Sequence, residues 1–304
     1  MIWAPRAPSG HRSAGLWRYA RRRLLVGAAQ IGAVVAVVYL LALALPGDAA
    51  IVAAGDDPDP ARVEAIRHQL ETQGWATSLR TGQPVLDVIA PALAPTLLLV
   101  AVTVALLLPG AVALGALSAY RSGTLLDRVI TTVTVGFEAV PEFALAVVLI
   151  TVFALQLDVL PATALELTPA ALVLPVVVLL ARSLCGLTRL VRAGTVDALG
   201  TGAVAHARRH GITGAALLFR HVLPLGIAPA TQQAARTIDW MIGGIVIVET
   251  VFAIPGISSV LVGAVSARDL PILAALAVLF AVATVLLNLA ADVVSFRLAP
   301  RAMP

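Results

Sequence analysis

Long apolar segments dominate this sequence and decide the class of fold it can adopt. The first lies at about 24–45, and five more follow at roughly 93–117, 129–155, 170–190, 230–250 and 271–294. About 20 consecutive apolar residues are enough to cross the roughly 30 Å hydrocarbon core of a bilayer. Only 12% of the residues are charged, against roughly 25% in soluble domains. The sequence therefore predicts an all-α membrane protein with six transmembrane helices.

The first apolar segment has a competing interpretation as a secretory signal peptide. It follows a basic stretch, residues 1–23, that ends in Arg21, Arg22 and Arg23, and signal peptides have the same order of charge and apolar residues. This segment is longer than a typical signal core, and only Ala42 and Ala44 offer weak cleavage positions. We interpret it as a retained first span.

The distribution of arginine predicts the orientation in the membrane. Sixteen of the 21 arginines lie near the termini and the connections at 118–128 and 182–225, and only four lie near the other connections. Short cytoplasmic segments carry the excess of positive residues, so both termini and the central connection are expected in the cytoplasm. The expected segments are a cytoplasmic tail (1–23), a first span (24–45), an extracytoplasmic loop (46–92), a five-helix core (93–296) and a cytoplasmic end (297–304).

The acidic extracytoplasmic loop contains one expected helix, from Pro60 to Gly74. Proline is favoured in the first turn of a helix and glycine just after its end. Asp56, Asp57 and Asp59 precede it, but they lack the spacing of a calcium loop. We interpret them as a solvated turn.

Several chemistries are excluded by composition. The chain has no lysine, so it holds neither a Walker A loop nor a Schiff-base lysine. Its one cysteine, Cys185, excludes an internal disulfide and a CxxC metal site. His206 and His210 are four residues apart, a weak metal signal for which partner contact is the better interpretation. We expect no enzyme, no cofactor or metal bound by this chain, and no nucleic-acid partner.

Charged residues within or beside the spans are candidate functional groups because charge is costly in a bilayer. Glu138 and Glu142 flank Pro141, which is expected to bend the third span. Others lie in the fifth and sixth spans: Arg236, Asp239, Glu249, Asn288 and Asp292. They could form a proton relay, or they could be charges at span ends. A relay would be needed by the alternative function, a proton-coupled secondary transporter.

The stretch from about Asp197 to Pro229 is the longest polar segment after the amino-terminal region. Small residues alternate with larger ones up to Gly211, and the apolar run AALLF follows. We expect a helix, a break at Gly211 and a second helix, since glycine tolerates the positive φ that a helix end often needs. An ordinary basic surface loop is the alternative.

Several short strings together resemble the inner-membrane permeases of binding-protein-dependent ABC importers, of the dipeptide/oligopeptide/nickel family. They occur in the order of that family and span nearly the whole chain. These are Pro46-Gly47-Asp48, SLRTGQPV at 78–85, Pro141 with Phe143, GGIVIVETVFAIPGI at 243–257, Arg268-Asp269-Leu270-Pro271, and Asn288 with Asp292.

The resemblance implies a type I ABC importer permease fold in the cell inner membrane. It implies a coupling loop at about 197–224 that docks on an ATPase subunit, with seven pattern residues: Ala205, Ala207, Arg208, Gly211, Ile212, Leu223 and Pro224. The string VAHARRHG departs from the bulkier sequence usual there, and Ala299-Pro300-Arg301 stands where Asp-Pro-Arg is common.

Candidate pathway or gate residues are Glu138, Pro141, Glu142, Asp239, Gly243, Gly244 and Glu249. The implied partners are a second homologous permease, two ABC ATPase subunits and an extracytoplasmic substrate-binding protein. The implied cargo is a peptide or nickel.

Overall fold

The computed structural model describes residues 21, 25–38, 40, 49–54 and 59–298, without the side chains of Asp239 and Asp292 among others. Most of the amino-terminal tail, the string Pro46-Gly47-Asp48, most of the acidic turn and residues 299–304 lie outside the described residues. Within the described ranges every regular element is a helix, and the only strand-like pairing there is an isolated bridge between Thr77 and Pro84.

The helices follow one another with short connections. A helix over Leu25–Val38 comes first. The others are α2 (Ala49–Ala54), α3 (Pro60–Gln73), η1 (Gly74–Ala76), α4 (Val85–Tyr120), α5 (Leu125–Ala139), α6 (Glu142–Leu149), η2 (Ile150–Gln156), α7 (Pro169–Leu199), α8 (Gly202–Arg209), α9 (Gly214–Leu217), η3 (Leu218–Val222), α10 (Leu223–Gly226), α11 (Ala228–Val251), α12 (Ile257–Ser266) and α13 (Leu270–Leu298).

Among the described residues, three helices are long and apolar enough to cross a membrane: Val85–Tyr120, Pro169–Leu199 and Leu270–Ala290. The bent pair formed by α5 with α6 and η2 would make a fourth. The expected fifth span coincides with the 24 residues of α11, which carry three charged side chains. The expected first span is described only in part. The structure thus supports a multi-pass helical protein, and the count of six spans stays a prediction.

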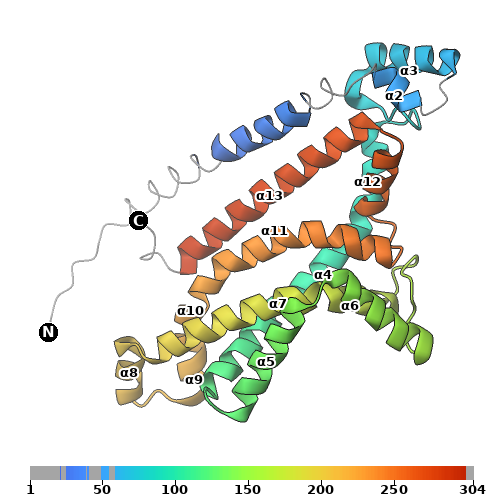
Figure 1. Ribbon diagram of the computed structural model, residues 1–304. Helices are drawn as coiled ribbons and strands as arrows, with labels where there is room; N and C mark the ends of the chain where they lie inside the picture. Colours follow the sequence, from blue (N-terminus) through green and yellow to red (C-terminus); the bar gives the residue numbers. More distant parts are fainter. Residues whose placement is uncertain (1–20, 22–24, 39, 41–48, 55–58, 299–304) are drawn as a thin grey trace.

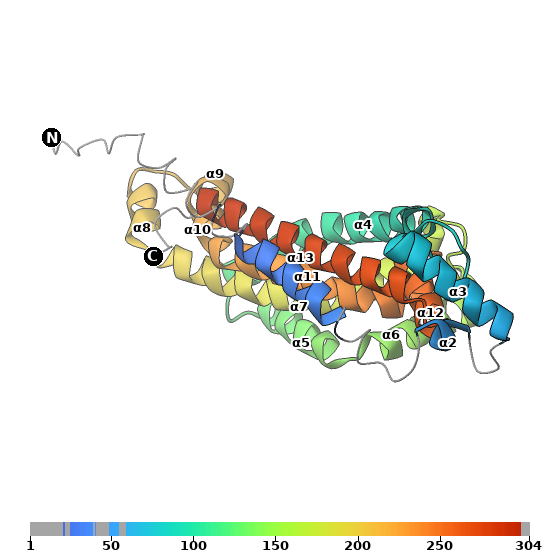
Figure 2. The ribbon, with the colours of Figure 1, turned by 90° about the horizontal axis from the view of Figure 1, so that it is seen from above.

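The long helices pack around α4 and α7, and the short ones gather at two opposite ends (Figure 1). The largest buried cluster runs between α4, α6, α7 and α11, with Leu107, Leu179 and Val248 among its members. Seen from above, α8, α9 and α10 lie at one end of the elongated bundle, and α2, α3 and α12 lie at the other (Figure 2). The predicted central connection and the predicted acidic loop are therefore separated by the length of the bundle.

Two expected local structures are confirmed. Helix α3 begins at Pro60 and is followed by Gly74 at φ +58°. In the central stretch, α8 ends at Arg209, Gly211 has φ +78°, and helical structure resumes at Gly214. Both glycines adopt the left-handed conformation that other residues enter only at a cost.

Helix α7 continues beyond the expected fourth apolar segment, which ended at about residue 190, and reaches Leu199. The buried stripe of α7 continues through Leu187, Val191 and Ala198, so packing extends the helix beyond its most apolar part. Arg182, Arg189 and Arg192 therefore lie on a helix and not in the 182–225 connection, where the arginine pattern had placed them.

Candidate functional site

The helix α8 sits on the end of α7 through a small apolar cluster. Thr201 accepts a hydrogen bond from the Val204 amide at 3.4 Å and starts the helix; such caps satisfy free N–H groups of the first turn. The inner face of α8 packs into a buried group that contains Ala198, Val204, Ala207, Leu217 and Val222. This short helix is held mainly by that one face.

The residues predicted for the coupling loop divide between the two faces of this region. Ala207 and Leu223 are buried, and Ile212 is half-buried. The side chains on the outer surface are Ala205, Arg208, Gly211 and Pro224, together with Arg209, His210 and Phe219. The alternating alanines thus do not all face outwards. The outer surface combines positive charge with exposed apolar area.

The segment that follows α8 and leads to α11 passes very close to α7. A side chain at Gly194 would overlap the backbone carbonyl of Gly226 at the end of α10, and one at Gly226 would lie within 2.8 Å of Thr195 Oγ1. Glycine at both positions lets the two backbones touch. A displacement of α8 to α10 must therefore act directly on α7.

The helical segment 125–156 breaks at Pro141, where a bend was predicted, and its two halves, Leu125–Ala139 and Glu142–Gln156, are bent by 104°. Glu138, before the break, forms an ion pair with Arg189 of α7 at 2.6 Å. Glu142, after the break, is buried against α11, where a side chain at Gly244 would lie 2.9 Å from its Oε2. The two acids therefore contact different helices.

The other predicted pathway residues besides Gly244 are Asp239, Gly243 and Glu249, all on α11. Gly243 is exposed on α11, and the side chain of Asp239 lies outside the described residues. His206 and His210 have ring centroids 4.2 Å apart. Among the described residues, no group of three or more His, Cys, Asp or Glu is placed to hold a metal ion.

Glu249, another predicted pathway or gate residue, lies in the interior of the chain. It is completely buried. Its carboxylate accepts hydrogen bonds from Thr96 Oγ1 of α4 at 2.5 Å, from the Ser258 amide at 2.9 Å, and from the Ser258 hydroxyl. It ties α4, α11 and the start of α12 together.

A second buried carboxylate, Asp269, joins two of the strings that carried the resemblance. Its Oδ2 accepts from Ser78 Oγ at 2.5 Å and from the Arg80 amide at 3.3 Å. Its Oδ1 accepts from the amides of Leu79 at 3.3 Å and Ile272 at 3.4 Å. The segment 78–85 and the start of α13 are thereby locked together, although sequence reasoning assigned no role to Asp269.

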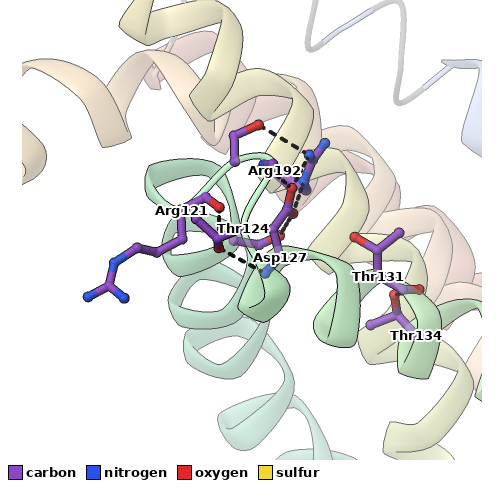
Figure 3. Close-up of polar contacts among 9 residues, drawn as sticks. Arg121, Thr124, Asp127, Thr131, Thr134 and Arg192 are labelled. Carbon is purple, nitrogen blue, oxygen red and sulfur yellow. Dashed lines mark hydrogen bonds and ion pairs between the residues drawn. The ribbon is translucent and has the colours of Figure 1, made fainter.

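A third buried carboxylate, Asp127, was also missed. It binds Arg192 of α7 through two parallel hydrogen bonds, of 2.7 and 2.8 Å (Figure 3). It also accepts from Ser118 Oγ at 2.5 Å and the Gly123 amide at 2.9 Å. Such two-point arginine–carboxylate pairs are strong and directional, so the turn between α4 and α5 is fixed to α7.

Comparison with known proteins places the chain in a family. Residues 111–303 match the family described as binding-protein-dependent transport system inner membrane component. The probable peptide ABC transporter permease protein y4tP of Sinorhizobium fredii is 32% identical over 307 residues, which cover 93% of this chain and 98% of that protein.

Two further relatives have the same kind of name. The glutathione transport system permease protein GsiC of Escherichia coli is 30% identical over 292 residues, covering 90% of this chain and 95% of its own. The metal-staphylopine import system permease protein CntB of Staphylococcus aureus is 30% identical over 245 residues, covering 80% and 78%. The chain belongs to the binding-protein-dependent transport system inner membrane components and is an ABC importer permease.

Proposed function

We propose that this chain forms half of the translocation pathway of an ATP-driven importer for peptides. A second, homologous permease would supply the other half, two ABC ATPase subunits would hydrolyse ATP, and an extracytoplasmic binding protein would deliver the cargo. The observation that carries the proposal is α8, whose inner face is buried against α7 while its outer face presents Arg208 and Arg209. A short helix anchored on one side and basic on the other suits a protein partner with acidic groups.

The proposed orientation places α8 and both termini in the cytoplasm, with six spans in all. The two short-helix ends of the bundle, with α8 at one and α3 at the other (Figure 2), are compatible with that arrangement. The excess of arginine near the α8 end supports it. The segment 46–92 and the residues around α12 would then face the binding protein.

Coupling would pass from α8 to the membrane core through backbone contact. Closure of the ATPase dimer would move α8, and the touching backbones at Gly194 and Gly226 would transmit the movement to α7. A nucleotide can drive such a change only by binding one conformation more tightly than the other. This chain itself would make and break no covalent bond.

The proposed cargo is a peptide, by analogy with the printed name of y4tP. Nickel or another small solute is the second possibility, and the other two relatives are named for glutathione and metal-staphylopine. Most of the choice among these would be made by the binding protein, which is a separate chain.

A proton-coupled secondary transporter gains no support. The relay would need Glu138 as a proton carrier, but Glu138 is held in an ion pair by Arg189 at 2.6 Å. The related proteins are named as parts of ABC transporters and import systems.

The test is affinity purification of the tagged chain from its native membrane in mild detergent, followed by uptake measurements in liposomes. We expect a second permease and ABC ATPases to co-purify, and uptake to require both ATP and the binding protein. Recovery of the chain alone, transporting without ATP, would contradict the proposal.

A further inference from the structure

We propose that Arg182, Ser183 and Arg236 form a binding site for a carboxylate group of the transported solute. This inference rests on the proposed function, because it places the site on the face of the chain that borders the pathway. It names a chemical group in the cargo, and it assigns a role to residues to which sequence reasoning gave no binding role.

An open cleft lies between α5, α7 and α11 at the position of these residues. Its volume is about 330 Å³, and it is lined by Glu138, Arg182, Ser183, Gly186, Gln233, Arg236, Thr237 and Trp240. A neighbouring cleft of about 350 Å³ shares Glu138, Gly186 and Gln233 and adds Arg189 and Leu190. Each volume falls in the range of small-ligand sites, roughly 300–1,000 Å³.

The cleft lies deep along the bundle and not at its end. Arg182 follows Pro169, the first residue of α7, by thirteen positions, which is about 20 Å along a helix of about 46 Å at 1.5 Å per residue. An arginine near the middle of a membrane helix is costly, and arginines that occur there mark solute or ion pathways.

The charge of the cleft is positive. The two neighbouring clefts are lined by one acid, Glu138, and by three arginines, Arg182, Arg189 and Arg236. Glu138 is paired with Arg189 at 2.6 Å, so these two charges compensate each other. Arg182 also interacts electrostatically with the buried Glu142 of α6. Three arginines against these two acids still leave a net positive charge at the cleft, which favours an anion.

Arg182 is held in a geometry that suits a carboxylate. Its guanidinium carbon lies 4.4 Å from the centre of the Trp240 ring, and this cation–π contact restrains the side chain. The N–H donors of the guanidinium lie in its plane, and these are the donors that bind a carboxylate in two-point fashion.

Ser183 provides independent support for a ligand-binding role of this cleft. It is 5% exposed, it lines the cleft, and among the described residues its hydroxyl oxygen has no hydrogen-bond partner. Buried hydroxyl groups without a partner are uncommon in native structures. A carboxylate held by Arg182 would lie beside this hydroxyl and could accept its hydrogen bond.

The experiment compares dialanine with dialanine amide, which lacks only the carboxylate. The permease pair with its ATPases is placed in nanodiscs without the binding protein, and ligand contact is measured by saturation-transfer-difference NMR. We expect binding of dialanine, about tenfold weaker binding of the amide, and about tenfold weaker binding of dialanine in Arg182→Gln, as loss of a charged hydrogen bond predicts.

Three further variants sharpen the test. Arg182→Lys keeps the charge but loses the planar donors, and is expected to bind with intermediate affinity, which separates recognition from misfolding. Glu138→Gln frees Arg189 and is expected to strengthen dialanine binding. Arg121→Gln removes an exposed arginine at the end of α4 and is expected to leave it unchanged.

The outcomes separate this site from the proposed function. Absence of dialanine binding, equal binding of the amide, or unchanged binding in Arg182→Gln would overturn the carboxylate site, even where ATP-driven, binding-protein-dependent uptake is observed in the same preparation. Carboxylate binding at Arg182 without such uptake would keep the site and overturn the importer.

Discussion

The two ends of this bundle are stabilised in different ways. At the end with α2, α3 and α12, two buried carboxylates, Glu249 and Asp269, hold neighbouring elements through networks of hydrogen bonds. At the other end, Asp127 fixes the turn between α4 and α5 to α7, but α8 itself is held by a small apolar cluster that includes Val204 and Leu217, and its outer face is exposed.

This difference indicates which end is built to stay fixed and which to receive a partner. A buried carboxylate with several donors specifies one geometry, because removing it leaves those donors unsatisfied. A small apolar contact can shift without leaving unpaired polar groups. The α8 end is therefore the better candidate for a moving, coupled element.

The largest expected effect follows replacement of Glu249 by alanine. The change leaves the Ser258 amide and hydroxyl without their acceptor, and we expect a loss of about 3 kcal/mol of stability, since each buried donor left unsatisfied costs roughly 1–3 kcal/mol. The thermal midpoint and the yield of folded importer in detergent are the measurements. Thr250→Ala is the matched control, since its hydroxyl bonds only within α11, to Val246; an equal loss in both variants would contradict this assignment.

A smaller loss is expected for Asp269→Asn at the same end. Asparagine has the same shape, but its amide group would bring a donor against the amides of Leu79 or Arg80. We expect a destabilisation of about 2 kcal/mol, measured as a lower thermal midpoint. Asp87→Asn, at an exposed position of α4, should change nothing, and indistinguishable midpoints for the two variants would show that the lock at Asp269 is unimportant.

At the α8 end, Gly211→Val is expected to uncouple transport while the importer still assembles. Gly211 has φ +78°, a conformation that costs a β-branched residue roughly 1–2 kcal/mol or more, so the end of α8 must rearrange. Uptake and ATPase activity are measured together. Gly202→Ala, at an open position of the same helix, is the control; transport at the original rate in Gly211→Val would count against coupling through this turn.

The smallest expected effect on stability comes from reversing the charge of Arg208 and Arg209. Both are exposed, so the free energy of unfolding should change by no more than about 0.5 kcal/mol. The thermal midpoint measures this change. Retention of the ATPases during purification should nevertheless fall in the variant, and in the original chain it should fall as salt is raised, because surface attraction is screened. Charge reversal at Arg62, on the exposed face of α3, should leave ATPase retention intact. Loss of the ATPases in the Arg62 variant, with normal retention in the Arg208 and Arg209 variant, would place the ATPase contact at the α3 end.

Much of the fold could be predicted because it depends on local pattern. Pro60 and Gly74 marked a helix, Gly211 marked a break, and Pro141 marked a bend, each through the backbone preference of one residue. The extension of α7 to Leu199 could not be predicted from hydropathy, since it depends on tertiary packing along a mixed stripe. Arg192, which lies on that extension, was assigned to a connection for the same reason.

The sites were less predictable because they depend on residues far apart in the sequence. Asp269 binds Ser78 across 191 positions, and Asp127 binds Arg192 across 65. The strings SLRTGQPV and Arg268-Asp269-Leu270-Pro271 each attracted notice, but nothing local indicates that they touch. Glu249 resembled a charge at a span end, and only the fold reveals its buried partners.

The most direct test of the account is photo-cross-linking from both ends of the assembled importer. A benzoylphenylalanine is placed at Ala205 on α8 or at Ala65 on α3, both exposed, and the adducts are identified by mass spectrometry. The account predicts an ABC ATPase adduct from position 205 and a binding-protein adduct from position 65. Binding-protein adducts from 205, or ATPase adducts from 65, would contradict it.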